Sequence, residues 1–178
     1  MSQNLKIIVN NIDKYKGRLE VYENNEKILK TEAFIGRNGA TKNKVEGDGK
    51  TPIGKYERGL CFGTHEEKEI SINDYIKIDE NMYWIDDIRS KYYNQMVDIT
   101  KVKKDWKSAE HLIEYPRQYE YAIEIKTNKE NIPCKGSAIF LHCSIENPTS
   151  GCVAIKKENM KLIFEKLKSI KNVKFEIM

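Results

Sequence analysis

Three short segments near the beginning of the chain carry apolar side chains at alternating positions, and this pattern constrains the fold more than any other feature of the sequence. The segments read LKIIVN, RLEVYEN and KILKTEAFIG, and turn-forming residues separate them. A period of two is typical of β-strands that bury one face. The first third of the chain is therefore predicted to form consecutive strands.

A glycine-rich stretch follows at positions 36–59, with the sequence GRNGATKNKVEGDGKTPIGKYERG. Its glycines and asparagines predict a long structured loop that returns to a strand near Ile53. The part GDGKTP is similar to a phosphate-binding loop, but such a loop needs a glycine where this chain has Lys44 and a helix where it has Pro52. We therefore expect a tight turn that can wall a cleft, and no nucleotide site.

The middle of the chain contains a helical pattern and then a strand pattern. The segment DWKSAEHLIEY predicts a short helix with Trp106, Ala109 and Ile113 on one side, and Pro116 ends it. The following YEYAIEIK alternates as a strand does. Four of its residues are expected to share one face: Tyr119, Tyr121, Ile123 and Ile125.

The last part of the chain continues the strand pattern. The short apolar segment SAIFLH predicts a central strand that brings His142 to the end of a sheet. Apolar spacing of three and four residues predicts a helix over 156–168, and NVKFEIM predicts a final strand. The expected fold is mostly β, with one or two short helices.

Length and composition describe an ordinary globular chain. It has 178 residues, of which 39% are hydrophobic and 33% charged, so we expect a single domain over 1–178. The net charge of +4 is mild, and its lysines alternate with glutamates, so nucleic-acid binding is not expected. We expect a monomer. No segment has the length of a membrane span or the apolar core of a signal peptide. The protein acts in the cytosol, or a targeting segment lies outside this sequence.

The segment AIFLHCSIENPTSGCVAI gathers His142, Cys143 and Cys152 in a chain with few histidines and cysteines. Neighbouring residues of a strand point to opposite faces, so His142 and Cys143 are poorly placed to share one metal ion. The sequence contains no C-x-x-C pair, and HEEKE at His65 lacks the second histidine of a zinc protease motif. We expect free thiols and neither metal nor other cofactor.

Nucleophilic catalysis is the remaining chemistry. It needs a thiol, a base near it and backbone donors for an oxyanion. His142 would end a rigid strand, and Cys152 follows Gly151, which permits unusual backbone angles. Spacing alone leaves two readings open, a catalytic pair or a buried cysteine that only fills the core.

The same residues resemble a known family. The segments IFLH and TSGCVAI, followed by a helix, are similar to the signature of the L,D-transpeptidases of the YkuD type. Upstream motifs extend the resemblance to the whole chain from Ile35 onward. They are IGRNG, KVEGDGKTPIGKY, WIDDIRSKYYNQMVD and DWKSAEHLIEYPRQYEYAI. The resemblance implies a β-sandwich that acts on peptidoglycan stem peptides.

Roles for the residues of the signature follow from the resemblance. It implies that Cys152 is the nucleophile, that His142 is its base and that the backbone carbonyl of Cys143 orients the imidazole. The amides of Gly151 and Cys152 would hold the oxyanion. The chain departs from the family in having Ser150 where a histidine is usual, and in a shorter loop before Cys152.

The implied reaction is acyl transfer through a thioester. Cys152 attacks the third residue of a donor stem and releases the terminal D-amino acid. An amine from an acceptor stem gives a transpeptidase, whereas water gives an L,D-carboxypeptidase. The alternative from another functional class is a domain that binds the cell wall and has no catalytic activity. The family implies the cell envelope or secretion, and a cytoplasmic location stays open. Expected substrate contacts are Thr149, Ser150, Lys50, Tyr93 and Trp106, with Arg37, Arg117 and Tyr92 as further candidates.

Overall fold

The computed structural model describes residues 4–178. Most strands join one nine-stranded sheet in the order β11-β12-β13-β3-β2-β1-β14-β6-β7. Strand β11 (Ala122–Ile125) pairs with β12 (Phe140–Cys143) on one side and with β6 (Gly54–Gly63) on the other, so the sheet closes on itself. The mostly β fold class is confirmed, with a closed sheet in place of the two separate sheets of a sandwich.

The first three strands follow the alternating pattern of the sequence. They are β1 (Asn4–Asp13), β2 (Lys16–Glu23) and β3 (Glu26–Phe34), and they pair antiparallel in chain order. Strand β14 (Asn172–Ile177) lies parallel to β1 and antiparallel to β6. Alternate apolar residues of β1 and β2 enter the main core, which confirms the prediction of strands with one buried face. These residues are Leu5, Ile7, Val9, Leu19 and Val21.

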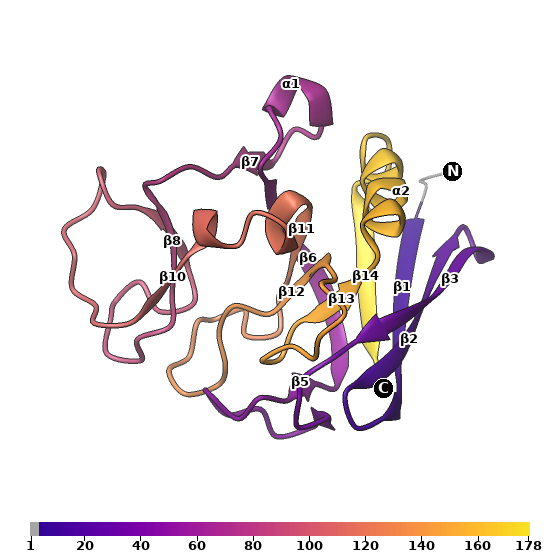
Figure 1. The fold of residues 1–178 in the computed structure, drawn as a ribbon, viewed down its shortest axis with the longest axis horizontal. Coiled ribbons are helices and arrows are strands. Elements are labelled where there is room, and N and C mark those ends of the chain that lie inside the picture. Colours follow the sequence, from indigo (N-terminus) through magenta and orange to yellow (C-terminus); the bar gives the residue numbers. More distant parts are fainter. Residues whose placement is uncertain (1–3) are drawn as a thin grey trace.

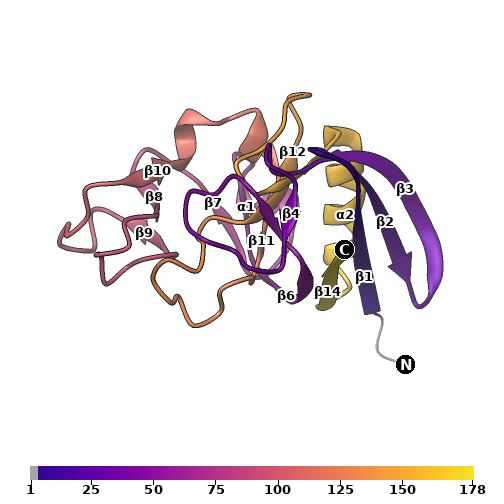
Figure 2. The same ribbon diagram turned by 90° about the horizontal axis from the view of Figure 1, so that it is seen from below.

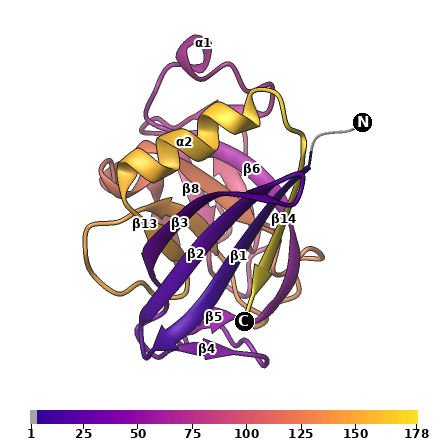
Figure 3. The ribbon, with the colours of Figure 1, turned by 90° about the vertical axis from the view of Figure 1, so that its right-hand side faces the viewer.

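Helix α2 (Lys157–Leu167) packs its apolar face into the same core (Figures 1 and 3). The buried residues are Met160, Ile163, Phe164 and Leu167, at the spacing of one helix face. The helix follows β13 (Val153–Ile155), as predicted.

The predicted loop after β3 contains two short parallel strands, β4 (Ala40–Thr41) and β5 (Thr51–Pro52). Strand β6 then begins at Gly54, close to the predicted return at Ile53. Beyond β6 come a one-turn helix, α1 (Glu67–Ile70), and β7 (Tyr75–Lys77), which forms the last strand of the large sheet.

The predicted helix over DWKSAEHLIEY is wrong. This segment contains β10 (Ala109–His111) and a 3-10 turn, η1 (Leu112–Glu114). Strand β10 pairs with β8 (Met82–Ile85), which also pairs with β9 (Met96–Asp98), so tertiary pairing overrides a weak local preference. Figure 2 shows this small sheet beside the large one.

The predicted strand YEYAIEIK is shorter than expected. A second 3-10 turn, η2 (Gln118–Glu120), takes up its beginning, and β11 starts at Ala122. As a result Tyr119 packs in a separate cluster with Phe62 and Phe140, while Tyr121, Ile123 and Ile125 enter the main core. The four residues therefore do not share one face.

Two absences apply to residues 4–178. No helix there is long and apolar enough to cross a membrane. No group of three or more metal-ligating side chains occurs in the same range.

Candidate active site

Strand β12 delivers neighbouring residues to opposite faces of the sheet. The Cys143 side chain lies in the main core, where its thiol donates to the carbonyl of Tyr121 at 3.8 Å. His142 points the other way and lines a cleft of about 480 Å³. All residues of β12 are buried because β11 and β13 pair with its two edges. The strand is therefore a rigid support for the imidazole.

The His142 ring is oriented by two neighbours. Its Nδ1 lies 2.9 Å from the carbonyl oxygen of Cys143, and the ring of Tyr119 meets it edge to face with 5.6 Å between centroids. A hydrogen bond at Nδ1 leaves Nε2 as the basic atom. Burial lowers the pKa of His142 to about 4, although the bond to Cys143 opposes this shift. The imidazole is neutral at pH 7.

Cys152 lies on the turn that precedes β13 and is 9% exposed. Its Sγ lies 3.1 Å from the carbonyl oxygen of Ala138, to which it donates, and 3.3 Å from the backbone N of Phe140, from which it accepts. Burial, together with a smaller effect of the Glu110 charge, raises the pKa of Cys152 to about 12. The N–H of Phe140 and the charge of Lys44 lower it. In the resting site the nucleophile is a neutral thiol.

Two threonine hydroxyls fix the backbone of this turn. Thr149 Oγ1 accepts from the amide of Gly151 at 3.1 Å and donates to the carbonyl of Cys152 at 2.7 Å. Thr51, which is completely buried, accepts from the amide of Gly36 and donates to the carbonyl of Gly151, both at 2.8 Å. The amide of Cys152 itself makes no hydrogen bond with any residue of 4–178. Of the two amides expected at the oxyanion, only that of Cys152 is unengaged.

Gly151 has a φ of +148°, which side-chain-bearing residues rarely adopt. A Cβ at this position would lie 3.1 Å from the carbonyl oxygen of Lys50 and 3.0 Å from a methyl carbon of Ile139. The turn therefore needs glycine both for its backbone angle and for its close approach to the neighbouring loop.

Cys152 and His142 line the same cleft, but no hydrogen bond joins them within the described part of the chain. The Sγ proton is directed at Ala138 instead. Attack by the thiol therefore requires the Sγ–H to turn from the Ala138 carbonyl toward the imidazole. Apo sites commonly show such loose geometry, which tightens when substrate binds.

The cleft carries charges of both signs. Arg37, Lys44 and Glu46 come from the loop after β3, whereas Asp86 follows β8 and Glu110 lies on β10. Glu110 accepts a hydrogen bond from the Tyr119 hydroxyl, and burial raises its pKa. Asp86 Oδ1 is buried without a hydrogen-bond partner among residues 4–178. Such a cleft suits a ligand with ammonium and carboxylate groups.

The structure brings together only some of the predicted substrate contacts. Thr149 and Ser150 line the cleft, and Ser150 Oγ accepts from Arg37 Nη1 at 2.7 Å. Thr149 is occupied by the backbone of the turn, so it supports the site more than it contacts a ligand. The remaining candidates do not line the cleft: Lys50, Tyr93, Trp106, Tyr92 and Arg117.

The reasons differ among these residues. Trp106 is buried with Ile85 and Val97 in a cluster that Tyr92 also contacts. Tyr93 is buried and donates to the Glu46 carboxylate. Trp106 and Tyr92 thus support the small sheet, whereas Tyr93 links its segment to the loop after β3.

Sequence reasoning missed several charged and polar residues of the cleft, among them Lys44, Asp86, Glu110 and Tyr119. Lysine and carboxylate residues are common in this chain, and no spacing sets these apart. Tyr119 was expected on a strand face of the main core, but the turn η2 redirects it toward His142.

The chain is similar to known proteins over most of its length. A model of the YkuD family, described as the L,D-transpeptidase catalytic domain, matches residues 6–174. The chain belongs to the YkuD family. A search of curated protein sequences found no match. Among solved structures, the helical cell shape determining protein Pgp2 from Campylobacter jejuni is similar to this YkuD domain with a TM-score of 0.53 and 16% identity. The alignment covers 99% of this chain and 48% of that protein.

Two further solved structures give weaker matches to this YkuD domain. Mycobacterium tuberculosis L,D-transpeptidase 1 has a TM-score of 0.43 and 14% identity, with 98% of this chain and 62% of that one covered. An L,D-transpeptidase from Stackebrandtia nassauensis has a TM-score of 0.45 and 12% identity, with 98% and 55% covered. The chain thus spans about half to three fifths of the length of these proteins.

Proposed function

We propose that this YkuD domain is an L,D-transpeptidase that acts on peptidoglycan stem peptides through a thioester on Cys152. The observation that carries the proposal is that Cys152 and His142 line one cleft while the Cys143 carbonyl orients the imidazole. A thiol, an oriented base and an unengaged backbone amide are the parts that acyl transfer needs. Family membership supports the peptidoglycan substrate.

The first half of the reaction forms the thioester. Because thiol and imidazole are both neutral at rest, the proton moves from Sγ to His142 Nε2 as Sγ attacks the carbonyl of the third residue of the donor stem. The negative charge on the carbonyl oxygen is held by the amide of Cys152. The protonated imidazole then gives its proton to the leaving nitrogen, and the terminal D-amino acid departs.

The second half consumes the thioester. An amine of an acceptor stem gives a proton to His142 and attacks the thioester carbonyl, and Cys152 leaves and regains the proton. Asp86 and Glu110, which both line the cleft, are suited to draw an ammonium group toward the site. Water in place of the amine would give an L,D-carboxypeptidase.

Purified muropeptides test the reaction. We expect the wild-type protein to release the terminal D-amino acid and to produce a cross-linked dimer, both resolved by mass spectrometry. C152A should form neither product. Release without dimer would identify a carboxypeptidase, and equal turnover by C152A would identify a non-catalytic wall-binding domain.

A carbapenem supplies a second readout that does not depend on the acceptor. We propose that it acylates Cys152, which mass spectrometry would detect as an adduct on the peptide that contains this residue. Cys61 and Cys143 are buried, and Cys134 is exposed but does not line the cleft, so they serve as internal controls. All of this activity would take place in the cell envelope.

A further inference from the structure

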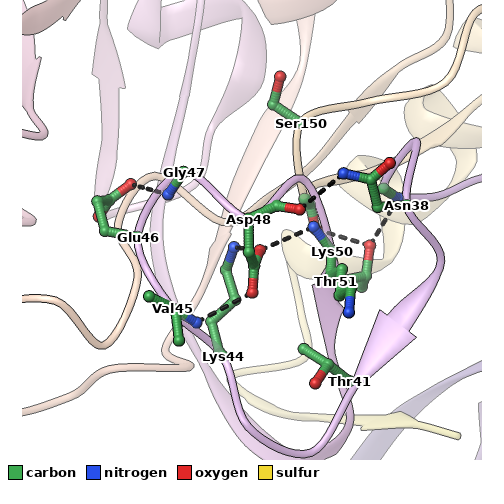
Figure 4. A network of polar contacts seen from close by, with 12 residues as sticks. Asn38, Thr41, Lys44, Val45, Glu46, Gly47, Asp48, Lys50, Thr51 and Ser150 are labelled. Carbon is green, nitrogen blue, oxygen red and sulfur yellow. Dashed lines mark hydrogen bonds and ion pairs between the residues drawn. The ribbon is translucent and has the colours of Figure 1, made fainter.

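Lys44 is a largely buried lysine beside the nucleophile. Its side chain is 9% exposed, and its ammonium forms an ion pair of 2.5 Å with Asp48. The Asp48 carboxylate is itself fixed, because it accepts from the amides of Val45 at 3.0 Å and of Lys50 at 2.8 Å (Figure 4). Three donors on one carboxylate hold the lysine in one place.

The path of the Lys44 side chain is set by two glycines. A Cβ on Gly136 would lie 2.8 Å from Lys44 Cγ, so the absence of a side chain there makes room for the lysine stem. At the other end, Lys44 Nζ lies 3.6 Å from the position of a Cβ on Gly151. The ammonium therefore rests against the turn that carries Cys152, and Lys44 also lines the cleft.

The charged and titratable groups around Cys152 come from several elements. Glu110 lies on β10, Tyr119 on η2 and His142 on β12. His142 is neutral at pH 7, and the pKa of Tyr119 is raised well above its usual value by burial, so this residue is neutral as well. Glu110 raises the pKa of the thiol, whereas Lys44 lowers it.

We propose that Lys44, held by Asp48, stabilises negative charge at Cys152, first on the sulfur and then on the carbonyl oxygen that the sulfur attacks. The thioester part of this inference rests on the proposed function. The effect on the sulfur does not rest on the proposed function, because the charge of the Cys152 thiol can be probed with any alkylating reagent. A cation is effective here because the Lys44 side chain is only 9% exposed, and solvent screens a buried charge less than an exposed one.

The test compares alkylation of Cys152 by iodoacetamide in K44M, D48N and K44R. The rate at each pH follows the thiolate fraction, and peptide mapping separates Cys152 from exposed Cys134, whose rate is the internal reference. We expect K44M to slow alkylation of Cys152 about tenfold at fixed pH, and K44R to restore most of it. D48N removes the negative charge beside Lys44 but keeps one acceptor oxygen, so it can accept from only one of the two turn amides, Val45 or Lys50. With the charge of Lys44 no longer offset, D48N should speed alkylation.

K42M is the matched control, because Lys42 is an exposed neighbour on the same loop. It should leave the rate unchanged. Opposite effects of K44M and D48N support the proposal. An unchanged rate in K44M, or an equal slowing in both variants, would overturn it and assign the ion pair to loop structure alone. If K44M does not fold, D48N decides alone: faster alkylation supports the proposal, and an unchanged or slower rate contradicts it.

Different experimental results would contradict the proposed function and the proposed role of Lys44. If C152A retains full turnover on muropeptides, the proposed function is wrong, and the alkylation rates still measure the effect of Lys44 on the thiol. If C152A is inactive and K44M alkylates like the wild type, Cys152 is the nucleophile and Lys44 has no electrostatic part in its reactivity.

Discussion

The hydroxyl of Thr149 bridges the peptide units on either side of the Gly151–Cys152 peptide bond, accepting from the Gly151 amide at 3.1 Å and donating to the Cys152 carbonyl at 2.7 Å. One side chain thereby restrains the peptide unit between them, which carries the amide of Cys152. The sequence predicts a substrate contact here, and the structure places Thr149 both on the cleft and in the support of the turn.

We therefore expect T149V to lower kcat by about ten- to a hundredfold with a small change in KM, because the amide of Cys152 would lose its alignment. T149S keeps the hydroxyl and should restore most of the activity. Steady-state kinetics on a defined stem peptide measures both. A large rise in KM with kcat unchanged would instead mark Thr149 as a substrate contact.

The two cysteines of the signature should differ sharply in how much activity is lost when serine replaces them. C152S should abolish turnover, because a serine hydroxyl next to a neutral imidazole is a much weaker nucleophile than a thiol. C143S should retain activity, since Cys143 contributes its backbone carbonyl to His142 and its thiol only contacts the Tyr121 carbonyl in the core. Loss of activity in C143S with an unchanged Tm would contradict this division of roles.

His142 predicts a pH dependence of stability. Its pKa is about 4 in the folded protein and about 6.5 in the unfolded chain, so the unfolded state binds the proton first as the pH falls. The contribution of the neutral His142 to the free energy of unfolding is fully present above about pH 6.5. It is lost progressively as the pH falls to about 4, by up to about 3 kcal/mol in total. Urea unfolding of wild type and H142N should show a smaller loss in the variant over this window. Parallel curves would contradict the assignment.

Glu110 should act on the thiol in the opposite sense to Lys44. Its charge raises the pKa of Cys152, so E110Q should increase the rate of alkylation of this cysteine at pH 8 by about three- to tenfold. The amide of glutamine can still accept from the Tyr119 hydroxyl, which keeps the local packing. An unchanged rate would mean that the carboxylate is screened from the sulfur.

Gly136 and Gly47 form a matched pair for the packing of Lys44. Both have a positive φ, +94° and +74°, but a Cβ on Gly136 would meet Lys44, whereas one on Gly47 would meet nothing within 4 Å. G47A should cost about 1 kcal/mol for its backbone angle alone. G136A should cost about 1–2 kcal/mol more, measured by denaturant unfolding. Equal losses would show that the lysine stem moves aside freely.

Much of the fold was predictable because apolar patterns in the sequence match burial in the structure. Strands β1 and β2 and helix α2 each bury one face with the expected period, whereas β12, which carries His142, is apolar throughout because all its residues are buried. The small sheet was not predictable. Its strands are three or four residues long, and β10 is extended because it pairs with β8, a partner distant in sequence.

The residues of the candidate site also divide into those that the sequence identifies and those that it does not. Cys152, Gly151 and His142 were identified because their residue types are rare and closely spaced. Lys44 and Glu110 were missed because lysine and glutamate are abundant, and only the folded chain shows which of them lie beside the sulfur. Trp106 and Tyr93 were misplaced because an aromatic residue looks the same in a sequence whether it lines a cleft or fills a core.

The closure of the large sheet limits how a peptide can be recognised. Strands β12 and β13 each have hydrogen-bonded neighbours on both edges, so neither offers a free edge to which a stem peptide can add as a further strand. Main-chain pairing, which tolerates almost any sequence, is thus closed to the ligand on β12 and β13. Strand β10, which carries Ala109 and Glu110 of the cleft, pairs only with β8 among residues 4–178 and keeps a free edge. Next to Cys152, recognition therefore falls to side chains of the cleft and to the turn amide, which favours a ligand defined by its charged groups.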